Sequence, residues 1–320
     1  MNRLYENVDK NMTQSHHYIQ TILDNAVRLA RLNNEGKIAD YIPELASAPA
    51  DIISIAVTLA DGTQLFAGDE EPRLYTLQSV AKLVVLIGLL EELGHDKVFS
   101  WVGAEPSGND FASLAKLDQV STRPSNPMLN AGSIALCGHI PGNSGQQMQW
   151  LDQWCEKLFN QKVQIDKDVF ISECATGNKN RSIGFLLKHN KIIEGDVEAI
   201  LANYFYLCSF ATTVRQATYL PLLLASGGVN LRGEQVISRA TVRTVVSIMM
   251  TCGLYNESGE HLVRTGMPAK SGVSGYMIAA VPHHAGIATM SPRINARGNS
   301  VRGELMLEYL ARELDWHLAI

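Results

Sequence analysis

The chain has 320 residues, of which 46% are hydrophobic and 18% are charged. This balance is typical of a globular protein with a substantial buried core, and it excludes a disordered chain. The 27 basic and 32 acidic side chains give a formal net charge of -5. Because no basic cluster interrupts this acidic balance, nucleic acid is not an expected partner.

The targeting and cysteine patterns favour a cytoplasmic protein. The N-terminal stretch MNRLYENVDKNMTQSHHYIQ is polar where a secretory signal needs an apolar segment. The apolar run at residues 83–90 is shorter than the roughly 18 residues of a membrane span, so no membrane partner is expected. Five irregularly spaced cysteines form neither a paired framework nor a CxxC metal site, which fits reduced thiols.

The N-terminal part of the chain predicts an outer helix followed by a β-hairpin. Residues 7–33 carry apolar side chains at helical spacing, including Ile22, Leu23 and Val27. The stretch DIISIAVTLADGTQLFAGD then contains two β-rich runs around Asp61-Gly62, a dipeptide that is typical of a tight hairpin turn. An antiparallel sheet is therefore expected to begin near residue 50.

Helical periodicity dominates the middle of the chain, and strand signals return near its end. Helical spacing between about residues 77 and 250 is interrupted by polar segments such as STRPSNPMLNAG and ECATGNKN. HLVRTGMP, GYMIAAVPH and AGIATMSP predict three strands, and GNSVRGELMLEYLARELDWHL predicts a final helix.

This order of elements predicts an α/β protein of the α+β sandwich type, with helices flanking an antiparallel sheet. The sheet is expected from about residues 50–76 and 256–320, and an inserted helical subdomain from about 77–255. The cleft between sheet and helices is the expected site.

A serine and a lysine lie at the start of the most apolar helix, in YTLQSVAKLVVLIGLLEELG. Lys82 follows Ser79 by three residues, so a helix places both on one face, near an end that favours developing negative charge. This arrangement suits a nucleophile and its base. For an isolated S-x-x-K pattern the commoner alternative is a serine that caps a core helix and a lysine that reaches solvent.

A second short pattern supports the first. Lys270-Ser271-Gly272-Val273 comes just before the expected strand GYMIAAVP. In acyl-transfer enzymes with an S-x-x-K motif, a K-[ST]-G strand lines the same cleft as the serine and supplies backbone donors to the reacting carbonyl. Two such short patterns also occur together by chance, so the motifs alone leave both interpretations open.

Longer strings make the chain similar to the serine-dependent glutaminase family, bacterial type, from about Gly36 to the C-terminal helix. The matching text is KIADYIPELA, LQSVAK, VGAEPSGNDF, NPMLNAGSI, ECATGNKNR, YFYLCSF, LASGGVN, MMTCGLYNESGEHLVRTGMPAKSGV and SPRINARGNSVRG. The resemblance implies a fold like that of the serine β-lactamases and penicillin-binding proteins, and hydrolysis of L-glutamine to L-glutamate and ammonia. It implies no metal or organic cofactor and a homodimer or homotetramer. Residues 36–320 would form one catalytic domain, and residues 1–35 an N-terminal extension with the outer helix.

The resemblance also implies roles for individual residues. Ser79 would be the nucleophile, Lys82 the group that keeps it deprotonated, and Tyr255 a residue that exchanges a proton with the serine or the leaving ammonia. Substrate binding would fall to Ser79, Asn130, Glu173, Asn180, Tyr204, Tyr255 and Val273. Val273 would contribute its backbone N–H to the oxyanion hole. Such a pocket suits a free amino acid, because a carboxylate can pair with its ammonium while amides and hydroxyls bind its carboxylate.

The proposed reaction requires a lowered pKa for Lys82 and leaves the first proton acceptor undecided. Lys82 can act as a base only if burial and the neighbouring Lys270 lower its pKa. Whether Lys82 or Tyr255 takes the first proton is not decided by the sequence.

Single residues also allow purely structural interpretations. Tyr204 is typical of a core aromatic, Asn130 and Asn180 are typical of turns, and Glu173 is typical of a helix end, so only the joint pattern favours a site. His283-His284 after Pro282 predicts an exposed turn rather than metal ligands.

Three departures from the family pattern concern substrate affinity. Tyr276, which follows KSGVSG, is expected to narrow or reshape the pocket. Lys179 stands where arginine is usual, and Ser182 replaces a small apolar residue, which would change local ion pairs. The stretch CGHIPGNSGQQMQW is rich in Gly and Pro and predicts a reshaped lid or loop.

Two alternatives to a glutamine amidohydrolase remain at this point. One is a β-lactam- or peptide-processing enzyme on the same framework, against which NPMLNAG and ECATGNKN argue. The other is a catalytically weak paralogue that binds an amino acid or a partner protein and uses the fold as a scaffold.

Overall fold

The structure is a computed structural model that describes residues 2–69, 73–107 and 123–319, with side chains from residue 15 onward. One string behind the family resemblance, VGAEPSGNDF, ends in residues 108–111, which lie outside the described residues. The first two residues of the predicted break STRPSNPMLNAG, 121–122, lie outside them as well.

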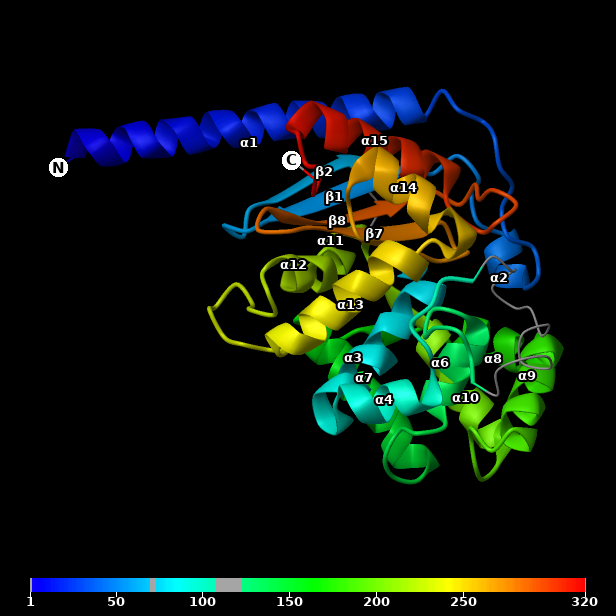
Figure 1. Ribbon diagram of the computed structural model, residues 1–320. Coiled ribbons are helices and arrows are strands. Elements are labelled where there is room, and N and C mark those ends of the chain that lie inside the picture. The colour runs from blue at the N-terminus through cyan, green and yellow to red at the C-terminus, as the bar shows by residue number, and fades with distance from the viewer. Residues whose placement is uncertain (1, 70–72, 108–122, 320) are drawn as a thin grey trace.

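A five-stranded antiparallel sheet occupies the upper half of the molecule in Figure 1. Its strand order is β2-β1-β8-β7-β6, so the first strands of the sequence lie beside strands from the far end of the chain. The strands are β1 (Ser54–Leu59), β2 (Gln64–Gly68), β6 (Ala269–Ser271), β7 (Tyr276–Val281) and β8 (Ala285–Met290). The predicted antiparallel sheet, built from both ends of the chain, is confirmed.

The predicted hairpin at Asp61-Gly62 is confirmed between β1 and β2. Thr58 pairs with Gln64 next to the turn, and the Asp61 side chain accepts a hydrogen bond from the backbone N–H of Thr63 at 2.8 Å. Every residue of β1 is buried, because β1 lies between two other strands and under helices on both faces. The edge strand β2 is partly exposed.

Two long helices cover the outer face of the sheet, α1 (Asn2–Ala30) and α15 (Val301–Leu314). The apolar side chains predicted to line one face of α1, among them Leu23 and Val27, are buried with Leu307 and Leu310 of α15 in one core. In Figure 1, α1 lies beside α15, and its N-terminal part continues beyond the rest of the molecule.

One strand prediction is wrong. The helix α14 (Ser258–Thr265) occupies most of the stretch HLVRTGMP, which was expected to be extended. His261 and Thr265 lie on its buried face, whereas Val263 is 80% exposed. Leu262 and Val263 are adjacent apolar residues on different faces of this short helix, and in the sequence such a pair resembles part of a strand. Only the three-residue β6 follows.

Helices from the middle of the sequence cover the inner face of the sheet. The short helices α11 (Val214–Ala217) and α12 (Tyr219–Ala225) pack against β1, β7 and β8, and α13 (Arg239–Cys252) packs against α3 and β6. The helical middle of the chain therefore supplies this layer as well as the lower, helical half of the molecule (Figure 1).

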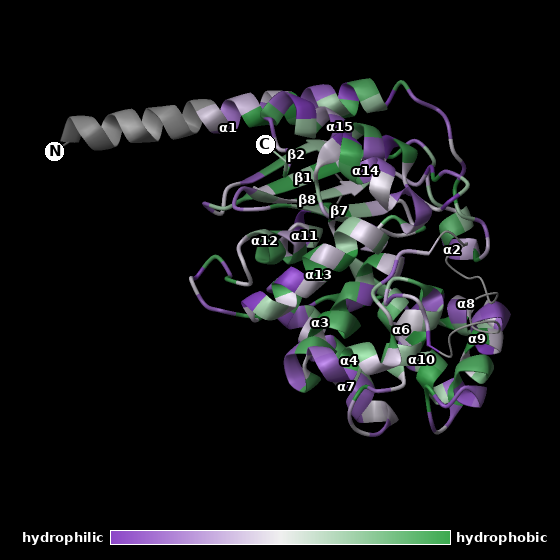
Figure 2. Ribbon diagram, viewed as in Figure 1, coloured by the Kyte–Doolittle hydropathy of each residue, from purple (hydrophilic) through white to green (hydrophobic). Residues whose placement is uncertain are grey.

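The lower half is built around α3 (Lys82–Leu93), which is buried from Lys82 to Leu90. Burial on all sides explains its continuous apolar run. The short helix α2 (Pro43–Ala46) lies beside this half. Its other helices are α4 (His95–Trp101), α6 (Asn130–Cys137), α7 (Ser144–Phe159), α8 (Lys167–Thr176), α9 (Asn178–His189) and α10 (Val197–Cys208). Figure 2 shows hydrophobic residues concentrated on the strands and inner helices. Within the described ranges, no helix combines the length and the apolar character needed to cross a bilayer.

A second sheet of three short strands was not predicted. It consists of β3 (Tyr75–Thr76), β4 (Gln164–Ile165) and β5 (Phe210–Thr212), in the order β3-β5-β4. Strands of two or three residues are too short to leave a periodic pattern. The sheet fixes the chain just before Ser79, where the backbone N–H of Leu77 donates to the carbonyl of Phe210 at 2.7 Å.

Within the Gly- and Pro-rich stretch CGHIPGNSGQQMQW, residues 138–143 form a loop between α6 and α7, as predicted, whereas residues 144–150 belong to α7. Asn143 begins α7 with a capping box in which its side chain and that of Gln146 each accept from the other's backbone N–H. No residue of this loop, 138–143, lines the pocket described below.

Candidate active site

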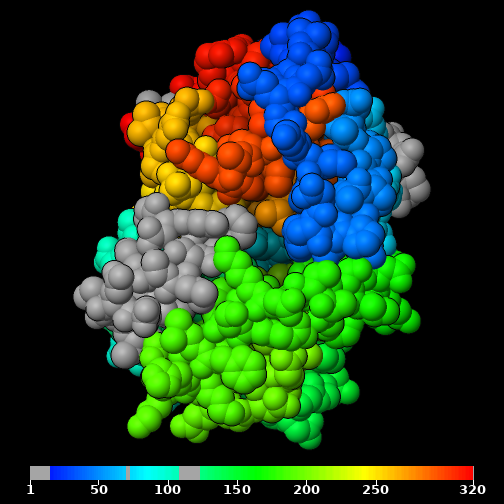
Figure 3. All heavy atoms as spheres, turned by 90° about the vertical axis from the view of Figure 1, so that its right-hand side faces the viewer, coloured from blue at the N-terminus to red at the C-terminus, as the bar shows by residue number. Residues whose placement is uncertain are grey.

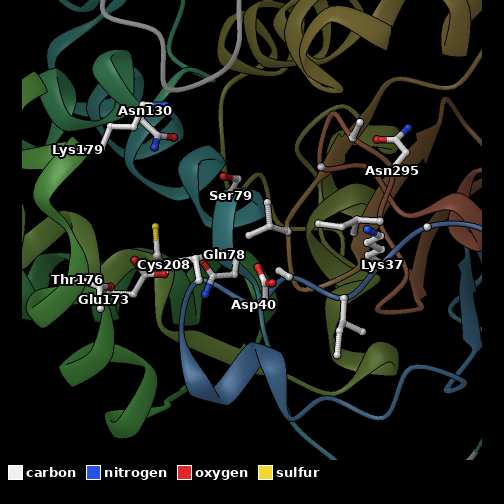
Figure 4. A pocket seen from close by; sticks show the side chains of 18 of the residues that line it. Lys37, Asp40, Gln78, Ser79, Asn130, Glu173, Thr176, Lys179, Cys208 and Asn295 are labelled. Atoms are coloured by element: carbon white, nitrogen blue, oxygen red, sulfur yellow. Dashed lines mark hydrogen bonds between the residues drawn. The ribbon is translucent and has the colours of Figure 1, made fainter.

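A pocket of about 990 Å³ lies between the sheet and the helical half of the molecule. Figure 3 shows this recess, with the segment before α2 (blue) to its right and α8 and α9 (green) below. Of the residues proposed from the sequence, the pocket is lined by Ser79, Asn130, Glu173, Asn180, Tyr204 and Val273. In Figure 4, Ser79 lies in the middle, with Asn130 and Glu173 on one side and Lys37 and Asn295 on the other.

Ser79 reaches the pocket because the chain turns sharply just before it. Gln78 has a φ of 48°, which is unfavourable for a residue with a side chain. The short helix η1 (Gln78–Ala81) then leads into α3. Strand β6 approaches this turn so closely that a Cβ on Gly272 would lie 2.6 Å from the carbonyl oxygen of Leu77. The glycine therefore allows Val273 to share the pocket with Ser79.

Lys82 is fully buried beneath the pocket and is linked to its lining through Asn130. Its Nζ donates hydrogen bonds to the carbonyl of Met128 at 3.0 Å and to Asn130 Oδ1 at 2.7 Å. Burial lowers the pKa of Lys82 to about 8, and nearby acidic groups, Cys208 foremost, oppose the shift. The neutral amine that a base requires is therefore accessible near neutral pH.

Lys270 and Tyr255 form a second buried pair on the sheet side. Lys270 Nζ donates to the carbonyl of Ser271 at 2.5 Å and lies 4.6 Å from the centroid of the Tyr255 ring. Burial, and then repulsion from Lys82, lowers the pKa of Lys270 well below its ordinary value. Tyr255 is 6% exposed and has a φ of 57°, so its turn is held in an unfavourable conformation.

A buried carboxylate lies on the helical side of the pocket. Glu173 in α8 is 6% exposed, and its Oε1 accepts a hydrogen bond from the Tyr41 hydroxyl at 2.7 Å. Burial raises the pKa of Glu173, while hydrogen bonds from Tyr41 and Gln78 oppose the shift. No ion pair to Glu173 is found among the described residues. Because a buried carboxylate is costly without a cation, the pocket favours a ligand with a positive group.

Two amides and a phenol complete this wall. Asn130, the first residue of α6, accepts from Lys82 and donates through Nδ2 to Asn180 Oδ1 at 3.0 Å. The ring of Tyr204 in α10 is 3% exposed, and its centroid lies 6.0 Å from Lys82 Nζ. These side chains offer both donors and acceptors to a polar ligand.

Sequence reasoning missed Tyr41 and Gln78, although both lie inside strings that carried the family resemblance. Tyr41 reaches across from the segment before α2 and donates to Glu173, and its hydroxyl oxygen also lies 3.2 Å from Gln78 Oε1. Because Gln78 is next to Ser79 in the sequence, its position could have indicated that it belongs to the site. Nothing local in KIADYIPELA indicates that Tyr41 meets α8.

The expectation that Tyr276 narrows the pocket is wrong. Its ring is fully buried between the sheet and the helical half, where its hydroxyl donates to the carbonyl of Thr212 at 3.1 Å and its ring packs edge-on against Tyr75. The alternation of β7 turns this side chain away from the pocket. Lys179 lies at the pocket rim, whereas the neighbouring Arg181 pairs with Glu198.

The predicted exposed turn at His283-His284 is confirmed between β7 and β8. Within the described part of the chain, no group of three or more His, Cys, Asp or Glu side chains has an arrangement that would hold a metal ion.

Fold and motifs together define a class of protein. A serine followed by a lysine at a helix start meets a Lys-Ser-Gly strand at the edge of an antiparallel sheet, as in serine acyl-transfer enzymes with a β-lactamase-like fold. A family model described as Glutaminase matches residues 36–318. The chain belongs to the glutaminase family.

Individual relatives agree with this assignment. A curated glutaminase of Legionella pneumophila (strain Lens) is 52% identical over 301 residues, which cover 93% of this chain and 97% of the relative. A solved probable glutaminase of Bacillus subtilis has a TM-score of 0.85 at 31% identity, over 92% of this chain and 96% of that chain. Mglu in its glutamate form has a TM-score of 0.88 at 31% identity, over 94% of this chain and 69% of that chain.

Proposed function

We propose that this protein hydrolyses L-glutamine to L-glutamate and ammonia through a γ-glutamyl ester on Ser79. The observation that carries the proposal is the buried carboxylate of Glu173 in the same pocket as Ser79. A free amino acid supplies the ammonium that such a carboxylate needs. The similarity to curated glutaminases supports the same substrate.

The substrate is bound by the helical wall. Glu173 pairs with the α-ammonium, and Tyr41 orients the carboxylate through its short hydrogen bond. Asn130, Asn180 and Tyr204 bind the α-carboxylate and fix the side chain of the substrate so that its amide meets Ser79. Mglu, the similar protein solved in a glutamate form, supports a pocket for the product in this fold.

In acylation, Ser79 Oγ forms a bond to the amide carbon and gives its proton to Lys82. A neutral lysine has two N–H groups and one lone pair. The carbonyl of Met128 and Asn130 Oδ1 accept the two N–H groups, so the lone pair is the position left for the serine proton. The backbone N–H groups of Ser79 and Val273 stabilise the negative oxygen of the tetrahedral intermediate.

The intermediate then breaks down. The proton passes to the amide nitrogen by way of Lys82 and Tyr255, the C–N bond breaks, and ammonia leaves. Water attacks the ester carbon and returns a proton through the same groups, and the bond to Ser79 Oγ breaks to release glutamate. Lys270 supports this step by holding the Tyr255 ring at 4.6 Å from its Nζ.

We also propose one catalytic domain at residues 36–320 with an N-terminal extension at 1–35, a cytoplasmic location, and a homodimer or homotetramer. The family match that begins at residue 36 supports the domain assignment. Five free cysteines support a reducing compartment. The resemblance to the glutaminase family supports association between subunits.

The test is ammonia and glutamate release from L-glutamine by the purified protein and by its Ser79→Ala variant. We expect turnover in the wild type and a loss of about 10⁴-fold or more in the variant. The control is Ser100→Ala, an exposed serine on α4, which is expected to keep wild-type turnover.

A glutamine-like diazoketone separates the alternatives when labelling is read by mass spectrometry. Labelling of Ser79 supports the ester mechanism. Tight ligand binding without labelling or turnover would favour an amino-acid-binding scaffold, and turnover of a chromogenic β-lactam without glutamine turnover would favour a β-lactam-processing enzyme.

A further inference from the structure

One asparagine outside the pocket lies between the two segments that carry Tyr255 and Lys270. Asn299 is 2% exposed, in the loop between β8 and α15. Its Oδ1 accepts from the hydroxyl of Ser271 at 2.5 Å. Its Nδ2 donates to Glu257 Oε2 at 2.5 Å and to the carbonyl of Leu254 at 3.2 Å. The side chain therefore uses both ends of its amide.

The chemistry of these partners fixes the orientation of the amide. A carboxylate and a backbone carbonyl only accept hydrogen bonds, so the NH₂ group of Asn299 must face Glu257 and Leu254. The oxygen then faces Ser271, whose hydroxyl donates. A carboxylate side chain at position 299 would place an acceptor against two acceptors, which is unfavourable in a buried site.

The joined segments are the turn that presents Tyr255 and the strand that presents Lys270. The turn is held internally by Ser258, whose hydroxyl accepts from the N–H of Leu254 and donates to the carbonyl of Tyr255. It lies so close to β6 that a Cβ on Gly253 would be 1.8 Å from the carbonyl oxygen of Ala269. Asn299 adds the side-chain connection from this turn to β6.

Glu257 is itself held by the loop that contains Asn299. Its carboxylate accepts from Asn295 Nδ2 at 2.8 Å and pairs with Arg297 at 3.4 Å. Asn295 also lines the active-site pocket, where Figure 4 shows it on the side opposite Glu173. The loop at residues 295–299 therefore contacts the pocket, the Tyr255 turn and β6 together.

We propose that Asn299 and Glu257 are positioning residues that fix Tyr255 relative to Lys270 for proton transfer in the reaction. The inference rests on the proposed function, because it assigns Tyr255 and Lys270 to the proton path. Neither residue touches the substrate. Their effect is to hold a turn with an unfavourable φ, that of Tyr255, at a fixed distance from the lysine.

The test replaces the donor of Asn299 by an acceptor of the same size. For Asn299→Asp we expect kcat for glutamine to fall by about 10- to 100-fold with KM within about threefold, because the substrate wall is untouched. Glu257→Gln in the same chain restores one donor between positions 257 and 299. The double variant is therefore expected to regain about tenfold in kcat over Asn299→Asp.

The matched control is Asn230→Asp. Asn230 Nδ2 also donates to a carboxylate, Glu234 Oε2 at 2.8 Å, but on an exposed loop far along the chain from the site. This control keeps wild-type kcat. A general loss of stability would lower kcat only in proportion to the unfolded fraction, which urea unfolding of the single and double variants measures.

Hydrogen exchange gives a readout that does not depend on glutamine turnover. We expect Asn299→Asp to speed exchange in the peptides that contain residues 253–258 and 269–273, and Asn230→Asp to leave both unchanged. If the wild type fails to hydrolyse glutamine, the proposed function falls, while exchange still decides whether Asn299 fixes the two segments. Unchanged exchange in both peptides, or unchanged kcat in an active protein, would overturn the positioning role.

Discussion

The two walls of the pocket hold their charged groups in different ways. On the helical wall, the side chains that face the substrate bind one another: Asn130 donates to Asn180, and Tyr41 donates to Glu173. The two buried lysines around Ser79 and β6 instead donate to backbone carbonyls, Lys82 to that of Met128 and Lys270 to that of its neighbour Ser271. We therefore expect the helical wall to bind the substrate and the groups around Ser79 and β6 to carry out the reaction.

Side-chain partners can be exchanged for a ligand, whereas backbone partners stay in place. A substrate that enters can share the Glu173 carboxylate with Tyr41 without moving a strand. Lys270 lies in β6 and Val273 follows the strand by two residues, so we expect both to keep their geometry through the reaction. The helical wall should therefore determine KM, and the buried groups around Ser79 and β6 should determine kcat.

The largest expected effect comes from the base. Lys82→Met should lower kcat by about 10³- to 10⁴-fold, because general base catalysis is lost, with a much smaller change in KM. In the wild type, activity should rise with pH through about 8, because burial lowers the pKa of Lys82 to about 8 and only the neutral amine accepts a proton. The variant should lack this limb of the pH profile.

Steady-state ammonia release from glutamine at several pH values measures both effects. Lys97→Met, which removes an exposed lysine on α4, is the control and should behave as the wild type. A Lys82→Met protein that keeps about a tenth or more of wild-type kcat would remove the lysine from the proton path.

The next effect tests the helical wall. Glu173→Gln should lower kcat/KM by about 10²- to 10³-fold, mainly through KM, because the substrate ammonium loses its buried partner. Tyr41→Phe removes one hydrogen bond to the same carboxylate and should raise KM by about tenfold. Isothermal calorimetry with glutamate, together with steady-state kinetics, measures both.

The control for this wall is Glu198→Gln, an exposed carboxylate that pairs with Arg181 outside the pocket. It should leave KM unchanged. A loss in Glu173→Gln that appears in kcat alone would contradict the division between the two walls. Because burial raises the pKa of Glu173, binding should also weaken at a higher pH than expected for an ordinary glutamate as the solution is acidified.

The smallest effect concerns stability. The pKa of Lys82 is about 8 in the folded protein against an ordinary value of 10.5, so the unfolded chain binds more protons between these values. Stability of the wild type should therefore rise with pH across this window, by at most about 3 kcal/mol from this group. Lys82→Met lacks this contribution, so its stability relative to the wild type should be greater at pH 7 than at pH 10.

Urea unfolding of the wild type and Lys82→Met at several pH values from neutral to alkaline measures this linkage. Lys97→Met serves again as the control, because it removes an exposed lysine in place of a buried one. A difference between Lys82→Met and the wild type that is constant with pH would show that the folded protein does not penalise the charged form of Lys82.

Much of the fold was accessible from local patterns. The hairpin at Asp61-Gly62, the strands β7 and β8 and the helix α15 each leave a periodic run or a turn dipeptide long enough to interpret. The stretch before β6 was misassigned because Leu262 and Val263 are adjacent but belong to different faces of α14. The sheet β3-β5-β4 was missed because its strands are too short.

The candidate site likewise contains residues that the sequence indicated and residues that it did not. Ser79, Lys82 and Lys270 lie in short motifs, and the remaining proposed residues lie in strings that resemble one family. Tyr41 was missed because its contact with Glu173 joins segments 132 residues apart. Tyr276 was misplaced because only the pairing of β7 determines which face of the strand its ring occupies.

The sequence by itself determined the family, the residue types of the site and the order of its motifs, because these are properties of short, contiguous text. Only the tertiary structure decided that Lys82 has a pKa near 8, that Glu173 is buried beside Tyr41, and that Asn299 joins the Tyr255 turn to β6. Burial and hydrogen bonding depend on which distant segments meet, and this is settled by the packing of the whole chain.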